Sequence, residues 1–211
     1  MVSRSYSLIL ISILLGIGFV VVATYMVRQT PADMLSPSPV REEVAYTYGS
    51  TRAPITIVEW SDAECPFCAR LHPTLKQLVD ESDGGVQWQY RHLPLPNHRM
   101  AEPAALAAEC VGREQGNDAF WQYLDTIFEN HNRLTQEFLT ASAQAAGVSS
   151  DVLQACFVDD ELAAIVATDV ATAQHFGGSG TPFSVIIMPD NTIRPVRGAL
   201  PLAQWQALLE S

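Results

Sequence analysis

The segment Ile55–Cys68 reads ITIVEWSDAECPFC and decides the fold. Its first part, Ile55–Trp60, is apolar and rich in β-branched residues, which is typical of a buried strand. Pro66 suits the first turn of a helix, because its missing N–H would have no partner there. Cys65 and Cys68 therefore stand at the start of a helix that follows a strand, with one helical turn between them.

The residues that follow complete a strand–helix–strand unit. Apolar residues recur at helical spacing as far as Val79, and the run Asp83-Gly84-Gly85 ends the helix. Apolar side chains alternate along Val86–Leu93, which predicts a second strand. A helix that connects two consecutive strands favours their parallel pairing.

The rest of the chain predicts a helical block and a final hairpin. The pattern is helical from Met100 to Phe176, with helices expected near 101–111, around 120–128, and near 136–146, 150–157 and 161–175. Two short strands at 183–188 and 192–196 enclose a Pro-Asp-Asn turn and precede a closing helix at 201–209. The hairpin should extend the same sheet, so the expected fold class is α/β.

The spacing of Cys65 and Cys68 is the redox arrangement of two cysteines at C-x-x-C. Free N–H groups and the positive end of the helix dipole face Cys65, which lowers the pKa of its thiol. A thiolate of low pKa is a good leaving group, so the disulfide is oxidising. Cys68 lies one turn inside the helix and should be shielded, with the role of resolving mixed disulfides.

A zinc site or an inert pair are the alternative interpretations of these two cysteines. Zinc sites generally need a second pair of ligands at short range. The other two cysteines are isolated and distant in sequence, and His72, His92 and His98 have no recognisable ligand spacing. We therefore expect redox chemistry, with no metal and no organic cofactor.

Composition excludes several classes of partner. The 211 residues include 23 acidic and 12 basic residues, for a formal net charge of −11, and Lys76 is the only lysine. An acidic chain without a basic cluster lacks the charge that phosphate binding or docking on anionic lipid requires. The length fits one globular domain with an appendage.

The appendage is the N-terminal segment. Leu8–Val27 carries no charge and is long enough to cross a bilayer, so residues 1–28 are expected to form a membrane anchor. A cleaved secretory signal is the alternative, and both interpretations export the rest of the chain. Prolines and serines mark residues 29–48 as a linker, which leaves 49–211 as the folded domain.

A family resemblance rests on residues spread over this domain. They are Ile57–Cys68, Arg91–Leu95 (RHLPL), His98, Ala104–Cys110 (AALAAEC), Phe120-Trp121 and Gly180-Thr181-Pro182. In this order they resemble the DsbA-like thiol:disulfide oxidoreductases of the bacterial cell envelope, within the thioredoxin superfamily. The resemblance implies a thioredoxin fold with an inserted helical subdomain at about 100–177.

The resemblance also implies roles for residues around the cysteines. Pro182 matches a cis-proline that faces the active-site disulfide, whereas the residues alone would favour an ordinary trans proline. Thr181 would then present backbone groups, and its hydroxyl, to a bound peptide. Pro66 and Phe67 lie between the two cysteines and belong to the same expected substrate-binding surface.

Glu59 interrupts the apolar strand six residues before Cys65. A carboxyl group inside a buried strand is costly unless it is paired or kept protonated by a raised pKa. The resemblance implies that such an acid moves protons to and from the second cysteine, here Cys68. A carboxylate that reaches solvent at the end of the strand is the alternative.

Cys110 and Cys156 each lie on a predicted helix of the inserted block. Two buried free thiols would pack there like small apolar residues. In an exported protein, however, a leftover pair suggests a bond, and some DsbA-like proteins carry a second disulfide in this subdomain. We therefore expect a structural Cys110–Cys156 disulfide.

These expectations combine into a membrane-tethered thiol:disulfide oxidoreductase that forms disulfides in exported proteins. It would be a single-pass protein of the bacterial inner (cytoplasmic) membrane, with its catalytic domain on the periplasmic side and a membrane-bound redox partner to reset the active site. Reductase or isomerase activity, and a non-catalytic chaperone or metal-delivery module, remain alternatives. The Pro-Phe dipeptide lacks the histidine of the strongest oxidases, which leaves the potential open.

Overall fold

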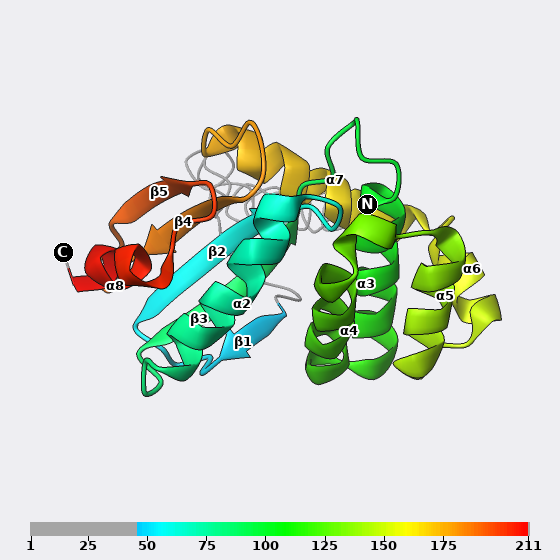
Figure 1. The fold of residues 1–211 in the computed structure, drawn as a ribbon, viewed down its shortest axis with the longest axis horizontal. Coiled ribbons are helices and arrows are strands. Elements are labelled where there is room, and N and C mark those ends of the chain that lie inside the picture. The colour runs from blue at the N-terminus through cyan, green and yellow to red at the C-terminus, as the bar shows by residue number, and fades with distance from the viewer. Residues whose placement is uncertain (1–45, 211) are drawn as a thin grey trace, which may run out of the picture. The chain divides into compact units, whose positions relative to one another are not determined.

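The computed structural model describes residues 46–210, and its helices and strands follow one another as Figure 1 shows. In chain order they are β1 (Thr47–Gly49), β2 (Ile55–Ser61), α2 (Pro66–Asp80), β3 (Val86–His92), α3 (Ala101–Gln115), α4 (Asn117–Glu129), the 3-10 helix η1 (His131–Arg133), α5 (Gln136–Ala145), α6 (Ser150–Cys156), α7 (Asp160–His175), β4 (Phe183–Ile187), β5 (Ile193–Arg197) and α8 (Leu202–Glu210).

The described part of the chain contains a five-stranded sheet with strand order β1-β3-β2-β4-β5. β2 pairs in parallel with β3, whereas the β1–β3, β2–β4 and β4–β5 pairs are antiparallel. The predicted strand–helix–strand unit and the C-terminal hairpin are thus confirmed. The central strand β2 carries Glu59, which lies opposite Tyr90 of β3 and Ser184 of β4.

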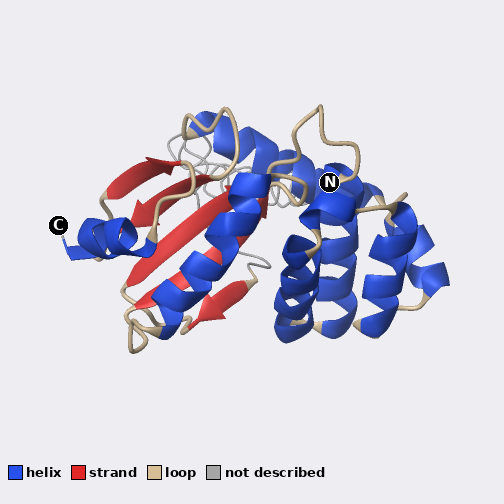
Figure 2. Cartoon of the chain, in the orientation of Figure 1, coloured by secondary structure: helices blue, strands red, loops and turns tan. Residues whose placement is uncertain are grey.

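Helices cover both faces of this sheet, as Figure 2 shows. α2 packs on β3 and on α8, and α7 packs on β2 and β3. Because side chains alternate along a strand, neighbouring residues of β2 enter different cores. Ile57 packs in the large core with Leu71 and Trp88, whereas Val58 packs in a smaller core with Phe183 and Ala173 of α7.

The predicted helical insertion is confirmed in α3, α4, α5 and α6, and side-chain caps mark where α5, α6 and the following helix α7 begin. Thr135 caps α5, Ser149 caps α6 and Asp159 caps α7, each accepting a hydrogen bond from a backbone N–H of the first turn. An oxygen at this position satisfies a backbone donor that the helix itself leaves unpaired. The polar residues between the apolar stretches therefore set the boundaries of these helices.

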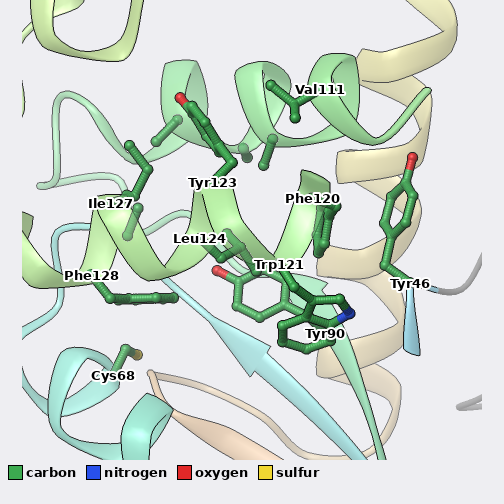
Figure 3. Close-up of a cluster of buried hydrophobic side chains, with 14 of the residues drawn as sticks. Tyr46, Cys68, Tyr90, Val111, Phe120, Trp121, Tyr123, Leu124, Ile127 and Phe128 are labelled. Atoms are coloured by element: carbon green, nitrogen blue, oxygen red, sulfur yellow. The ribbon is translucent and has the colours of Figure 1, made fainter. Parts of the chain in front are cut away.

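An aromatic cluster joins the insertion to the sheet. Tyr90 of β3 lies edge-on to Phe120 and Trp121 of α4, and Tyr46 stacks on Phe120 at a centroid distance of 3.9 Å. Figure 3 shows these rings together with Cys68 at the border of the same cluster. The apolar contact of the insertion therefore reaches the second cysteine of the C-x-x-C motif.

Two features differ from the sequence-based expectation. β1 is an added strand that begins within the segment assigned to the linker, and Tyr46 next to it is buried. α7 falls in the predicted insertion, yet it contacts both α3 and the sheet, so it belongs to both parts of the domain. Periodicity alone identified α7 as a helix but not the surface against which it packs.

The expected membrane anchor at 1–28 and nearly all of the expected linker lie outside the described residues. Between residues 46 and 210, no helix has both the length and the apolar composition needed to cross a bilayer.

Candidate active site

Cys65 lies at the N-terminus of α2, between the strand β2 and the helix. It is the N-cap residue, with φ −75° and ψ 120°, and Pro66 occupies the first turn as predicted. The Cys65 N–H donates to the carbonyl oxygen of Asp62 at 3.1 Å, which fixes the loop before the helix. In this part of the chain Cys65 and Cys68 are free thiols, with Cys65 4% exposed and Cys68 fully buried.

The surroundings of the two thiols drive their pKa values apart. A hydrogen bond from the Cys68 thiol is the largest influence on Cys65 and lowers its pKa, against the opposing effect of burial. The Thr181 side chain and the backbone N–H groups of Cys68 and Phe67 lower it further, so the pKa of Cys65 falls to about 5. The expected contribution of the helix start is present, but the neighbouring thiol contributes more.

Cys68 has the opposite character. Burial raises the pKa of its thiol, and the hydrogen bond to Cys65 and the charge of Glu59 raise it further. The Asp62 N–H lies 3.5 Å from the Cys68 sulfur. At neutral pH the arrangement therefore holds a thiolate at Cys65 and a thiol at Cys68.

The loop before β4 approaches Cys65 from the other side of the site. The Thr181–Pro182 peptide bond is cis, and the Thr181 carbonyl oxygen lies 3.5 Å from the Cys65 sulfur, where it can accept from the protonated thiol. Phe67 is 52% exposed, with the Arg70 guanidinium 4.7 Å from its ring centre. A nearly covered sulfur thus lies beside an exposed ring and a backbone segment that can pair with a peptide.

Glu59 lies in the buried middle of the site. Its side chain is 1% exposed, and neither carboxyl oxygen has a hydrogen-bond partner within residues 46–210. Burial raises the pKa of Glu59 to about 8, although Ser61 and Trp88 favour the charged form. The alternative of a carboxylate that reaches solvent is wrong, because the strand is covered on both faces. Glu59 is a protonated acid at neutral pH, in electrostatic contact with Cys68.

Asp62 is a site residue that the sequence did not reveal. Its side chain is 0% exposed, and it accepts hydrogen bonds from the N–H of Glu64 at 2.8 Å and of Leu95 at 2.7 Å. It also binds Nδ1 of His98 at 2.9 Å. The only signal was an acid three residues before Cys65, because its partners Leu95 and His98 lie more than thirty residues further along the chain.

The Cys110–Cys156 disulfide forms a second sulfur site, inside the helical subdomain. It joins α3 to the end of α6 with the two Cα atoms 5.9 Å apart, and both residues are fully buried. Arg113 Nη2 lies 3.1 Å from the Cys156 sulfur, and Nη1 of the same guanidinium binds Asp159 at 2.6 Å. This bond links α3 to α6, and the contacts of its sulfurs differ from those of Cys65 and Cys68.

The histidines considered as zinc ligands are engaged separately. His72 binds Asp125 at 2.7 Å, His92 binds Glu109 at 3.1 Å, and His98 binds Asp62. These pairs do not bring an imidazole into a ligand set with Cys65 and Cys68.

A buried group that could hold a cation lies between β3, α3 and α7. His92, Glu109 and Asp169 bring their ligand atoms within 4.8 Å of one another. The guanidinium of Arg91 already lies 3.2 Å from Asp169, so a positive charge compensates the carboxylates. Because these charged side chains pair with one another, they can be buried where the insertion meets the sheet.

Comparisons with known proteins agree with this geometry. The family model described as "Thioredoxin" matches residues 41–211. The crystal structure of Pseudomonas aeruginosa DsbA2 matches with a TM-score of 0.68 and 28% identity, over 81% of this chain and 96% of that one. A probable disulfide bond formation protein D of Bacillus cereus is 32% identical over 95 residues, which are 44% of this chain and 43% of that protein.

Another relative is much longer than this chain. The Na(+)/H(+) antiporter NhaA 1 of Salinispora arenicola is 33% identical over 145 residues, which are 68% of this chain but only 22% of that protein. The chain thus spans about a fifth of the length of the curated antiporters that it matches.

Proposed function

We propose, since the chain belongs to the thioredoxin family and is DsbA-like, that it is a thiol:disulfide oxidoreductase that forms disulfide bonds in exported proteins. The observation that carries this proposal is the opposite character of two neighbouring sulfurs. Hydrogen bonds, above all that of Cys68, lower the pKa of Cys65 to about 5, whereas burial raises the pKa of Cys68. A stabilised thiolate favours the reduced pair, which makes the corresponding disulfide an oxidant.

The reaction proceeds by two exchanges of sulfur partners. In the oxidised enzyme a substrate thiolate attacks Cys65, the Cys65–Cys68 bond breaks, and Cys68 leaves as a thiolate. A second substrate thiolate then attacks the substrate sulfur of the mixed disulfide, and Cys65 leaves. The substrate dithiol loses two electrons and two protons. The cysteine pair gains the two electrons, Cys68 takes up one proton, and the other proton passes to solvent because Cys65 stays a thiolate.

Glu59 supplies a proton in the first exchange. A buried Cys68 thiolate is strongly disfavoured, as its raised pKa indicates. The carboxyl group of Glu59, with a pKa of about 8, carries a proton at neutral pH and can give it to Cys68. In the reverse direction the carboxylate takes the proton back before the disulfide reforms.

The surface around Cys65 is suited to an extended peptide. A substrate segment that lies along Thr181 and Pro182 can form backbone hydrogen bonds to that loop, in the manner of an added strand. Phe67 offers an exposed ring next to the reacting sulfur. Because these contacts are to backbone and to one apolar ring, they accept many sequences.

The N-terminal sequence supports a location at the membrane. Residues 1–28 anchor the chain in the bacterial inner membrane, with the folded domain on the periplasmic side, where disulfides persist. A membrane-bound redox partner accepts the two electrons from the reduced Cys65–Cys68 pair. The apolar stretch of spanning length supports the anchor.

The reduction potential of the Cys65–Cys68 pair tests whether the protein oxidises or reduces its substrates. We expect equilibration with glutathione to give a value well above the roughly −270 mV of thioredoxin, towards the roughly −120 mV of a strong oxidant. The protein should also introduce disulfides into a reduced, unfolded test protein. A potential near that of thioredoxin would identify a reductase instead, and tight zinc or copper(I) binding lost with Cys65→Ser would favour metal delivery.

A further inference from the structure

We propose that the Asp62–His98 pair sets the charge beside the Cys65 thiolate, so that protonation of His98 makes the Cys65–Cys68 disulfide a stronger oxidant. This inference rests on the proposed function and concerns the regulation of the same site. Asp62 and His98 act through Cys65 and are positioning residues.

Asp62 connects the two sulfurs to a second loop. Its backbone binds both members of the pair, since its carbonyl accepts from the Cys65 N–H and its N–H points at the Cys68 sulfur. Its carboxylate accepts from the N–H of Leu95 and binds His98, both in the segment between β3 and α3. Asp62 therefore links His98 to the loop that contacts both cysteines.

A buried carboxylate needs a positive partner. The Asp62 side chain is 0% exposed, whereas that of His98 is 22% exposed and can exchange protons with solvent. Because a carboxylate only accepts, Nδ1 of His98 carries a hydrogen and donates it to Asp62. Protonated His98 supplies the charge that compensates Asp62, and neutral His98 leaves a net negative charge next to Cys65.

Three acidic groups near His98 favour its charged form. Burial alone would lower the pKa of His98, but the hydrogen bond and charge of Asp62 raise it, with further attraction from Glu64 and Cys65. Glu64 belongs to the same loop and accepts from the N–H of Met100, which holds the two segments together. His98 therefore stays protonated to a higher pH than an ordinary histidine and loses its charge as the pH rises through that value.

The loss of this charge changes the stability of the thiolate. With His98 protonated, the pair Asp62–His98 is neutral overall, and a thiolate at Cys65 meets no excess negative charge. With His98 neutral, the Asp62 carboxylate repels the thiolate, which disfavours the reduced form. The dipeptide Pro66-Phe67 contains no histidine, so an imidazole that acts on Cys65 has to come from outside the C-x-x-C motif.

The variant His98→Gln keeps an N–H donor for Asp62 and removes the charge. In the full-length reduced protein, we expect thiolate absorbance to show the pKa of Cys65 raised by on the order of half to one unit. The equilibrium constant for oxidising glutathione should fall about three- to tenfold, which corresponds to about 15–30 mV. His175→Gln is the matched control, an exposed histidine at the end of α7, and should change neither value.

A measurement on the unmodified protein removes any dependence on the folding of a variant. The coupling of two sites is reciprocal, so the Cys65 thiolate must raise the pKa of His98 by as much as His98 lowers that of Cys65. NMR titration of the His98 ring should therefore give a higher pKa in the reduced than in the oxidised protein. Equal values in the two states, or an unchanged Cys65 in His98→Gln, would overturn the inference.

These readouts are independent of substrate oxidation. A His98 shift between redox states in a protein that forms no disulfides would contradict the proposed function alone. Disulfide formation with no response to His98 would contradict this inference alone.

Discussion

The two sulfur pairs of this chain are both buried, and they differ in what surrounds them. Cys65 and Cys68 lie three residues apart at the start of α2, whereas Cys110 and Cys156 lie 46 residues apart on α3 and α6. The first pair is surrounded by the acid Glu59, by the loop of Thr181 and its cis-proline, and by the backbone of Asp62. The second pair has helix packing and the guanidinium of Arg113.

This difference shows that burial alone does not make a disulfide structural. Cys65 is almost as covered as Cys110, yet hydrogen bonds to its sulfur stabilise the thiolate. A pair becomes reactive when one sulfur is stabilised as a thiolate and the other has a proton source. The second pair closes a long loop and is expected to restrict the unfolded chain.

The largest change in exchange rate is expected when Cys65 of the first pair is replaced. Cys65→Ser should abolish disulfide exchange, at least a thousandfold, because the stabilised nucleophile and leaving group is gone. Cys68→Ser should instead accumulate mixed disulfides with substrates, since the resolving thiol is missing. Non-reducing gels after mixing each variant with a disulfide-bonded test protein distinguish the two, because the Cys65 thiolate attacks that disulfide and releases one substrate thiolate. Turnover by Cys65→Ser, or trapping by Cys65→Ser and not Cys68→Ser, would reverse the assigned roles.

The second pair should affect stability and not turnover. Replacing Cys110 and Cys156 together by alanine opens a loop of 46 residues, which by chain entropy costs about 4 kcal/mol of unfolding free energy. Urea unfolding of the double variant measures this loss. The exchange rate at a temperature where both proteins are folded should stay within about twofold of the unmodified protein. A tenfold slower rate would mean that the second pair also takes part in the exchange.

The sequence predicted most of the fold because its signals are local. Apolar periodicity placed each helix and strand of the core, and C-x-x-C with a following proline placed the redox pair at a helix start. Glu59 could be singled out because a charged residue inside an apolar strand is visible without a structure. Its raised pKa follows from burial by both faces of the sheet.

The parts that escaped prediction depend on contacts between distant residues. The role of Asp62 requires knowing that the segment of Leu95 and His98 folds back onto the loop before Cys65. β1 has three residues and no apolar alternation, so only its pairing with β3 defines it. Such features have no local pattern, and a single sequence cannot show them.

Glu59 gives the most specific effect, because its charge acts on Cys68 of the first pair. A glutamate of the unfolded chain has a pKa near 4.5, against about 8 in the fold. Between these values the unfolded state binds fewer protons, so the unfolding free energy falls as the pH rises, by about 1.4 kcal/mol per pH unit from this group. Glu59→Gln should remove that slope and be more stable than the unmodified protein at pH 8.

The redox state separates this effect from that of the neighbouring thiol. In the oxidised protein the cysteines do not titrate, and the difference between the unmodified protein and Glu59→Gln isolates Glu59. In the reduced protein Cys65 contributes the opposite sign, because its pKa is lowered on folding and the unfolded state holds its proton to higher pH. Urea unfolding at pH 5, 6, 7 and 8 in both states should therefore show a steeper fall with pH when the pair is oxidised. An oxidised protein whose pH dependence is unchanged by Glu59→Gln would mean that this carboxyl is ionised in the fold and cannot protonate Cys68.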